Sequence, residues 1–471
     1  MSDTPAAEDG ALTWLHLGLG SFHRAHQAVY LHHLRETGDH RWSIVAGNLR
    51  ADMEATASAL AAQGGEYTLE TVTPGGERRY ERIASIREVV PFEPTLARLI
   101  EVGAAAATPI ISFTVTEAGY YLGIDDRLDL SHAELRADLD GLACSTIYGA
   151  VARVLRERMR RSGAPVTLLN CDNLRSNGKR FRAGLLDFLE RRGEGGLQRW
   201  VEANTTCPSA MVDRITPRPA ADVAERVLAA TQRSDRSPVM AESFIQWVIE
   251  EDFAAGRPAW ERVGVEMVAS VHAHEEAKIR ILNASHSGVA WAGTLRGLTF
   301  IHEGIAVPAI RELAWNYVTR DVIPCLDTAE RPSPIGLAAY RDVVLERFGN
   351  PFVRDTNQRV AMDGFSKIPG FIVPTLRECI AGGRPIASTA MLPALFFAFL
   401  ERWHRGELPY AYVDGVMDEA VAHAFFTAPE PLLAFGRDPR LWADLAGHPA
   451  LVAALHEAHA RVLDFTSDRK P

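Results

Sequence analysis

The chain has 471 residues, of which 47% are hydrophobic and 23% are charged, and its formal net charge is −10. This composition is typical of a folded globular protein, and the length exceeds what one hydrophobic core usually organises, so we expect two domains. The acidic balance argues against a nucleic-acid partner, because binding to a duplex needs a basic face.

From its sequence we expect neither export nor membrane insertion. It begins with the acidic, polar stretch MSDTPAAEDGAL, which resembles neither a signal peptide nor a transit peptide. The most apolar run, MLPALFFAFL, is about half the length that spans a bilayer and is expected to be a buried helix. The cysteines are odd in number and far apart, which favours reduced, buried thiols and a cytoplasmic protein; they are Cys144, Cys171, Cys207, Cys325 and Cys379.

The first part of the chain alternates between expected strands and helices. Residues 12–20, LTWLHLGLG, predict a first strand that ends in glycines, and residues 24–37 follow with apolar side chains at helical spacing. Later strands are predicted at RWSIVAGNL, PIISFTVTE and PVTLLNCDN, with a helix at STIYGAVARVLRERMRR. Near-continuous apolar runs are typical of parallel strands buried on both faces. The alternation therefore predicts an α/β domain with a doubly wound sheet, whose ligands bind at the carboxyl ends of the strands.

The character of the sequence changes after about residue 270. Residues 275–298 and 388–406 show long helical patterns, and convincing strands become scarce. We therefore expect a first domain over residues 10–272 and a mostly α-helical second domain over residues 273–471.

Two glycines, Gly18 and Gly20, stand where the first expected strand turns into the first helix. Gly18 suits a tight turn, and Gly20 would let the backbone approach a pyrophosphate at the helix N-terminus. The third glycine of the usual dinucleotide fingerprint would fall at His23. A plain strand-to-helix turn can use the same glycines, but their place after a first strand favours a nucleotide cofactor.

NAD usually bonds its adenosine ribose to an acid near the end of the second strand. Asp39 has the usual spacing from the glycines, but it precedes residues 41–49 and so belongs to the wrong edge of the sheet. Asp52, just after that strand, is the better candidate. Arg50 beside it leaves the 2′-phosphate of NADP as an alternative, and both charges also suit a solvated loop.

The most specific group of candidate catalytic residues is Lys278, Asn283 and His286, near the start of the expected helical domain. On a regular α-helix Asn283 and His286 share a face, while Lys278 lies about 80° from His286 and about 12 Å from it along the axis. Convergence on one site then requires the lysine stem to lean toward Asn283.

These residue types suit hydride transfer from an alcohol, which needs a base for the hydroxyl proton and donors for the reacting oxygen. A lysine acts as a base near neutral pH when burial or nearby positive charge lowers its pKa. A helix with a solvated lysine, a capping asparagine and a core histidine is the alternative. No metal is expected, because His272, His274 and Glu275 match no zinc-ligand spacing and no cysteine is near.

Several segments together resemble the polyol-specific long-chain dehydrogenases, the mannitol dehydrogenase family. In chain order they are GLGSFHRAHQ, TVTEAGYY, NCDNLRSNG, AMVDRITP, FIQWVIEEDF, GRPAWERVGV, KIRILNASH and GFSKIP. The resemblance covers nearly the whole chain and is far more specific than the paired glycines. It implies a Rossmann-type N-terminal domain that binds the dinucleotide, a mostly α-helical domain that carries substrate and catalytic residues, and an active site in the interdomain cleft.

The resemblance also implies roles for individual residues. Lys278 would be the general base, Asn283 and His286 would hold the reacting oxygen, and Glu275 would pass the proton to water. Contacts to the polyol hydroxyls are implied for Asn173, Asp213, Arg359 and Lys367, and contacts to NAD for Gly18, Gly20, Phe22 and Asp52. The acidic neighbour that the family has beside the NAD-selecting acid is Ala51 here, which weakens the inference of a strict preference for NAD.

For the substrate contacts, the residues alone leave other roles open. Arg359 and Lys367 are also compatible with surface charges, and Asp213 with Arg214 is compatible with an ion pair that orients the domains. Asn173 also suits a strand-end cap.

Within the family, four segments are most similar to members that act on D-arabinitol: KIRILNASHSGVAWAGTL, YRDVVLERF, DTNQRVAMDGFSKIP and TAMLPALFF. We therefore expect metal-independent, NAD-dependent oxidation of D-arabinitol to D-xylulose by a monomer. The nearest alternative is oxidation of mannitol to fructose. The next alternative is reduction of a uronate, in which Arg359 or Lys367 would bind the carboxylate. A non-catalytic sensor of nicotinamide or polyol is a further alternative, although a sensor would not need Lys278 as a proton acceptor.

Overall fold

The computed structural model describes residues 11–123, 127–217 and 222–467. The expectation about a leader peptide rests mainly on residues 1–10, which lie outside these ranges. The described residues form two compact units. Unit 1 comprises those up to Thr73 together with Glu77–His272, and unit 2 comprises Pro74–Gly76 together with those from Ala273 onward. Within the described ranges, none of the helices has both the length and the apolar character that crossing a membrane requires.

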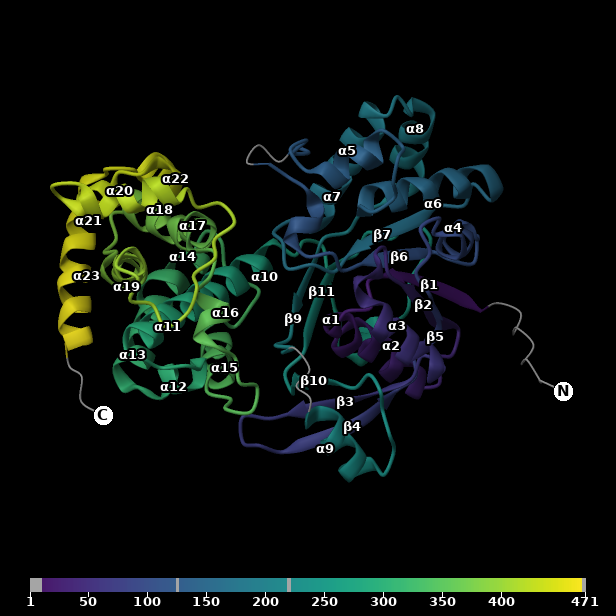
Figure 1. Cartoon of the computed structure of the whole chain (residues 1–471), viewed down its shortest axis with the longest axis horizontal. Coiled ribbons are helices and arrows are strands. Elements are labelled where there is room, and N and C mark those ends of the chain that lie inside the picture. Colours follow the sequence, from purple (N-terminus) through teal and green to yellow (C-terminus); the bar gives the residue numbers. More distant parts are fainter. Residues whose placement is uncertain (1–10, 124–126, 218–221, 468–471) are drawn as a thin grey trace. The chain divides into compact units, whose positions relative to one another are not determined.

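Unit 1 is organised around a six-stranded sheet with the strand order β5-β2-β1-β6-β7-β8 (Figure 1). Every neighbouring pair of strands in this sheet is parallel. The strands are β1 Leu12–Leu17, β2 Trp42–Gly47, β5 Ile86–Val90, β6 Ile110–Phe113, β7 Val166–Asn170 and β8 Thr205–Thr206. The apolar runs of the sequence correspond to β1, β2, β6 and β7, so the predicted Rossmann-type parallel sheet is confirmed.

Alternating side chains of these strands pack on opposite faces of the sheet. Leu15 and Val45 pack with residues of α4 Ala97–Ala104, α6 Ile147–Arg161, α7 Asn177–Arg191 and α8 Gly195–Asn204. Trp14 and Ile44 pack with residues of α2 Gln27–Glu36 and α3 Glu54–Ala62. Because helices cover both faces, β1, β2, β6 and β7 are buried along nearly their whole length and are mostly apolar.

Two three-stranded sheets complete the strands described in unit 1. One has the order β10-β3-β4, with β10 Val239–Glu242, β3 Tyr67–Val72 and β4 Arg78–Ile83. The other has the order β12-β11-β9, with β12 Glu266–Val268, β11 Gln246–Glu250 and β9 Ala210–Asp213. The shorter helices α5 Ala133–Leu139 and α9 Asp222–Thr231 also belong to unit 1. These sheets were not predicted; β4, for example, reads RRYERI and shows no apolar run.

Unit 2 is helical, as predicted, and its described residues contain no strand, only an isolated bridge between Phe300 and Thr356. Its α-helices are α10 His272–Ala277, α11 Ala284–Leu295, α12 Ile301–Ala306, α13 Pro308–Asn316, α14 Ile323–Leu326, α15 Leu337–Phe348, α16 Asn357–Ala361, α17 Gly364–Lys367, α18 Val373–Ala381, α19 Ala387–His404, α20 Glu419–Thr427, α21 Pro431–Gly436, α22 Pro439–Trp442 and α23 Pro449–Ser467. Three stretches within this chain of helices are π-helical: η4 Lys278–Asn283, η5 Tyr317–Val322 and η6 Ile368–Ile372.

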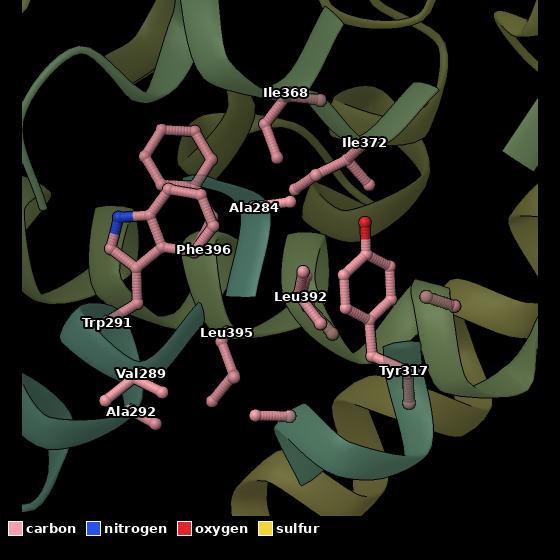
Figure 2. Packing of buried hydrophobic residues seen from close by; sticks show 14 of the residues in the cluster. Ala284, Val289, Trp291, Ala292, Tyr317, Ile368, Ile372, Leu392, Leu395 and Phe396 are labelled. Atoms are coloured by element: carbon pink, nitrogen blue, oxygen red, sulfur yellow. The ribbon is translucent and has the colours of Figure 1, made fainter. Parts of the chain in front are cut away.

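The core of unit 2 forms where α11 packs against α19. Figure 2 shows Trp291 of α11 beside Phe396 of α19, and their ring centroids lie 4.9 Å apart. Tyr317 of η5 and Ile368 of η6 belong to the same buried cluster. The run MLPALFFAFL lies in α19 and is buried over most of its length, so the prediction of a buried helix is confirmed. All five cysteines are free and buried, as expected.

Candidate active site

The turn after β1 contains two glycines with different geometries. Gly18 has φ +119°, and a Cβ on it would lie 2.7 Å from the carbonyl oxygen of Thr114. Gly20 has φ −62° and directly precedes α1 Ser21–Ala25, and a Cβ on it would meet nothing within 4 Å. The backbone itself therefore requires glycine at position 18, whereas Gly20 keeps a space open in front of the helix.

The helix that follows is interrupted, and a pair of histidines packs it on the sheet. His26 has φ −131° and ψ −86° and separates α1 from α2. His23, where the fingerprint has its third glycine, stacks on His16 of β1 with ring centroids 3.4 Å apart. Burial lowers the pKa of His23 to about 3 and also holds the pKa of His16 well below its usual value. Two neutral imidazoles therefore make the helix-to-strand contact that the third glycine makes in the usual fingerprint.

A cavity of about 520 Å³ lies at the carboxyl ends of β1, β2 and β6. This volume falls within the range of cofactor and small-molecule sites, and the place is the one expected for ligands of such sheets. Among the residues that line it are Gly18, Leu19, Gly20, Asn48, Arg50, Asp52, Thr114, Val115, Thr116, Gly119, Tyr121 and Ile147.

Asn48 connects the glycine turn to this cavity. Its Oδ1 accepts a hydrogen bond of 2.8 Å from the backbone N–H of Leu19. Its Nδ2 is buried and has no hydrogen-bond partner in the part of the chain that the structure describes. An unsatisfied buried amide is costly, and an acceptor oxygen of a ligand would satisfy it. The open space at Gly20 and this amide donor both fit a phosphate-bearing cofactor.

The predicted cofactor contacts are not all in the cavity. Gly18, Gly20 and Asp52 line it, and Asp52 is exposed in the turn that follows β2. Phe22 is not part of the lining, and its ring stacks on His26 with centroids 4.9 Å apart. The contact of Phe22 with a cofactor therefore stays a prediction that the cavity does not support.

The other two charges considered for cofactor selection, Arg50 and Asp39, already have partners. Arg50 donates a hydrogen bond of 2.8 Å to the hydroxyl of Tyr121, which uses part of the guanidinium that a 2′-phosphate would need. Asp39 accepts hydrogen bonds of 2.9 and 2.6 Å from the Nε and Nη2 of Arg41, before β2 begins. The cavity lining includes Asp52 but not Asp39.

Asp172 holds the loop after β6, and residues of this loop line the cavity. Its Oδ1 accepts hydrogen bonds of 2.9 and 2.8 Å from the backbone N–H groups of Val115 and Thr116, and its Oδ2 accepts one of 3.1 Å from the hydroxyl of Tyr120. Burial raises the pKa of the Asp172 carboxyl to about 6, although these donors favour its charged form. Sequence reasoning missed this role. The available signal was an acid directly after a strand, within NCDN, because neighbouring parallel strands end at the same edge of the sheet.

The other two predicted site residues of unit 1 also follow strands. Asn173 is exposed shortly after β7, and Asp213 is the buried last residue of β9. Arg214 donates hydrogen bonds of 3.0 and 2.9 Å from Nε and Nη2 to the carbonyl oxygen of Glu242, so it supports the main chain of unit 1. The contacts of Asn173 and Asp213 with a substrate stay predictions.

In unit 2, the segment with the predicted catalytic residues is not a regular α-helix. Lys278–Asn283 is a π-helix, inserted between α10 and α11. The angle and rise derived for an α-helix are therefore wrong for this segment. Five residues turn about 500° on an α-helix, which leaves the first and last about 140° apart, whereas a π-helix bonds residue i to residue i+5. The π-helix thus brings Lys278 and Asn283 to one side, and such insertions are frequent at functional sites.

The residues around this turn are buried. Lys278 is 7% exposed and Glu275 is 4% exposed, which is unusual for charged side chains. His286 lies on the first turn of α11 and is 8% exposed. Glu275, Lys278 and His286 thus come from one continuous helical segment with little access to solvent.

His286 contacts a carboxylate that sequence reasoning missed. Its Nε2 lies 3.3 Å from Oδ2 of Asp355, and Arg359 binds the same carboxylate through two hydrogen bonds of 2.6 Å. Burial opposes the charge of Asp355, but His286 and Arg359 outweigh it and hold the pKa of this carboxyl well below its usual range. A signal was present in DTNQR, because an acid four residues before an arginine often pairs with it.

Burial lowers the pKa of His286, and the positive charges of Arg359 and Lys367 lower it further. Both residues therefore lie near His286. Lys367 also donates a hydrogen bond of 2.7 Å from Nζ to the carbonyl oxygen of Val360. Six of the predicted site residues belong to unit 2: Glu275, Lys278, Asn283, His286, Arg359 and Lys367. Their contacts with a substrate stay predictions.

Comparison with known proteins gives matches over nearly the whole chain. Residues 13–262 match the mannitol dehydrogenase Rossmann domain, and residues 270–463 match the mannitol dehydrogenase C-terminal domain. The chain is 61% identical to a D-arabinitol 4-dehydrogenase of Ralstonia nicotianae, with 97% of each chain covered. It is 56% identical to a D-arabinitol 4-dehydrogenase of Klebsiella pneumoniae, with 96% of this chain and 98% of the relative covered.

A solved structure resembles the chain as well. It is the mannitol 2-dehydrogenase of Pseudomonas fluorescens in a ternary complex with NAD and D-mannitol, with a TM-score of 0.83 and 31% sequence identity. The match covers 98% of this chain and 95% of that one. The chain therefore belongs to the mannitol dehydrogenase family and is an oxidoreductase of the polyol dehydrogenase type.

Proposed function

We propose that this protein oxidises the C4 hydroxyl of D-arabinitol to give D-xylulose, with NAD as hydride acceptor and Lys278 as proton acceptor. The observation that carries the chemistry is the π-helical turn, which puts the buried Lys278 on the same side as Asn283. The choice of substrate rests on the 61% identity to the D-arabinitol 4-dehydrogenase of Ralstonia nicotianae.

In this proposal the cavity of unit 1 holds the dinucleotide, which supplies a nicotinamide ring able to accept a hydride. Gly18 shapes the turn, and Gly20 leaves room for the pyrophosphate. Asn48 offers its unsatisfied Nδ2 to an acceptor oxygen. Asp52 is exposed at the cavity and accepts hydrogen bonds from the ribose hydroxyls.

The residues of unit 2 then handle the proton and the reacting oxygen. Lys278 accepts the hydroxyl proton, and Asn283 donates a hydrogen bond to the oxygen as it becomes a carbonyl. Glu275, buried three residues before Lys278, passes the proton to water. Asn173, Asp213, Arg359 and Lys367 bind the remaining hydroxyls, because recognition of a polyol needs several fixed polar groups.

The test is the appearance of NADH at 340 nm with the purified protein. Substrates are D-arabinitol, D-mannitol, D-sorbitol, xylitol and L-arabinitol, each with NAD or NADP and each with and without a chelator. We expect the highest kcat/KM with D-arabinitol and NAD, unchanged by the chelator. A higher kcat/KM with D-mannitol would replace the substrate, and no turnover across the panel would contradict the proposed function.

Oxidation of mannitol is the second candidate, because the chain resembles a mannitol 2-dehydrogenase that binds D-mannitol and NAD. The same lysine and asparagine would serve it. The lower identity, 31% against 61%, ranks it below D-arabinitol.

Two finer expectations belong to the same proposal: that the enzyme works as a monomer and that it works in the cytoplasm. The five free, buried cysteines support a reducing compartment. Sedimentation of the purified enzyme at assay concentration measures its oligomeric state.

A further inference from the structure

His286 is held by an aromatic ring and a carboxylate of unit 2. Its ring stacks on Phe348 at the end of α15, with centroids 4.5 Å apart and planes inclined by 15°. Its Nε2 is buried and lies 3.3 Å from Oδ2 of Asp355, an ion-pair contact whose geometry falls outside that of a hydrogen bond. The stack defines the plane of the imidazole, and the carboxylate defines its rotation within that plane. Nδ1 is therefore the nitrogen that remains for a substrate.

Asp355 is itself held in place. Its side chain is 8% exposed and receives the Nε and Nη2 hydrogens of Arg359, each at 2.6 Å. Arg359 lies in the short helix α16, whose N-cap Thr356 accepts a hydrogen bond from the Arg359 backbone N–H. A bidentate hydrogen bond of this kind orients the carboxylate and also stabilises its charged form. The Oδ2 atom that faces His286 therefore has little freedom to turn away.

The chemistry of the two groups determines where the imidazole proton lies. An ionised carboxylate only accepts hydrogen bonds, and a neutral imidazole carries one N–H. Asp355 therefore favours the proton on Nε2 and leaves the lone pair on Nδ1. The charged groups around His286 are Asp355, Arg359 and Lys367, and of these only Asp355 favours a positive imidazole.

We propose that Asp355 is a positioning residue: it keeps the His286 proton on Nε2, so that Nδ1 accepts a hydrogen bond from a hydroxyl of the polyol. This inference rests on the proposed function, and it deepens it. His286 would orient the substrate hydroxyl before the proton leaves, while donation to the carbonyl oxygen falls to Asn283. Arg359 supports this role by fixing the carboxylate, in addition to any contact it makes with the substrate.

The first test is the histidine tautomer in the wild-type protein. With ¹⁵N-labelled histidine, and with His286→Ala to assign the signal, the ¹⁵N shifts of His286 should report the Nε2–H tautomer at pH 7. In Asp355→Asn, Arg359 retains the oxygen of the new amide and its NH₂ group faces His286, so the signal should move toward the Nδ1–H tautomer. An Nδ1–H tautomer in the wild type would overturn the proposal, even if the variant did not fold.

The second test is kinetic. Asp355→Asn should lower kcat/KM for D-arabinitol by roughly 10- to 100-fold, the range for loss of a hydrogen bond to a charged group. NADH affinity should stay unchanged. In a His286→Ala background the same change should cost less than about twofold, since the two residues act as one unit. Equal losses in both backgrounds would assign Asp355 a purely structural role.

A matched control is available in the same unit. Asp438 is also buried and also receives Nε and Nη2 of an arginine, Arg440, so Asp438→Asn removes an equivalent charge pair. It should lower the melting temperature and leave kcat/KM and the His286 tautomer unchanged. If the wild type oxidises no polyol but Asp355→Asn still shifts the tautomer, the proposed function fails while the positioning by Asp355 stands.

Discussion

The two units build their parts of the candidate site in different ways. In unit 1 the cavity is shaped by the main chain: by the conformation of Gly18, and by backbone N–H groups bound to Asn48 and Asp172. In unit 2 the polar groups are side chains on helices, notably Lys278 and His286. A cavity shaped by the main chain cannot change without altering the fold, whereas a side chain on a helix can be replaced. We therefore expect changes to the main-chain contacts of unit 1 to affect stability as well as cofactor binding, and changes in unit 2 to affect turnover.

The largest expected effect is at Lys278. Lys278→Met removes the proton acceptor and keeps a long apolar stem, so kcat should fall by roughly 10²- to 10⁴-fold, the usual contribution of general base catalysis. NADH affinity, measured by fluorescence titration, should stay within about twofold of the wild type. Lys179→Met, at an exposed position of α7, is the control and should leave both values unchanged. Near-normal turnover in Lys278→Met would remove lysine from the mechanism.

The glycine turn of unit 1 offers a matched pair of variants. Gly18→Ala adds a Cβ at φ +119° and 2.7 Å from the carbonyl oxygen of Thr114, so it should cost about 3 kcal/mol of unfolding free energy and abolish NADH binding. Gly20→Ala adds a Cβ into open space at φ −62°, so it should keep the melting temperature and lose only NADH affinity. Equal stability of the two variants in urea unfolding would contradict the proposed difference between the glycines.

The buried carboxyl of Asp172 predicts a pH dependence of stability. Its pKa is raised to about 6 in the folded protein, from 3.8, so the folded state binds the extra proton between these values. This contribution is fully present below about pH 4 and is lost as the pH rises through 6, by at most about 3 kcal/mol. Asp172→Asn keeps an acceptor oxygen and does not titrate. The difference in unfolding free energy between wild type and variant, measured from pH 4 to 7, should therefore shift against the wild type, and a flat difference would argue against the raised pKa.

A smaller effect is expected at Asn48. Asn48→Ala removes the acceptor of the Leu19 N–H and should cost about 1–2 kcal/mol, both in stability and in NADH binding. Asn48→Asp keeps that acceptor and removes only the amide donor, so the melting temperature should hold while NADH affinity falls. If Asn48→Asp binds NADH as the wild type does, the unsatisfied Nδ2 has no role in cofactor binding.

Much of unit 1 was predictable because its strands are buried on both faces. The runs that form β1, β2, β6 and β7 are mostly apolar and almost fully buried, which is typical of strands in a parallel sheet. The charged strand β4 escaped prediction because only Ile83 of its six residues is buried and no periodic apolar signal remains. The break of the first helix at His26 escaped because no glycine or proline marks it in the sequence; the Nε2 of His26 lies 2.9 Å from the carbonyl oxygen of Gln246, far along the chain.

The sequence by itself determined the parallel sheet, the glycine turn, the helical character of unit 2 and the family, because each of these leaves a local pattern in adjacent residues. Only the tertiary structure decided that Lys278–Asn283 is a π-helix, since one extra residue in a turn changes hydrogen bonding without changing composition. It also decided that His286 faces Asp355 and that Asp172 holds the loop after β6. These pairs join residues far apart in the chain, and their positions depend on how the surrounding helices and strands pack, which no periodicity in the sequence records.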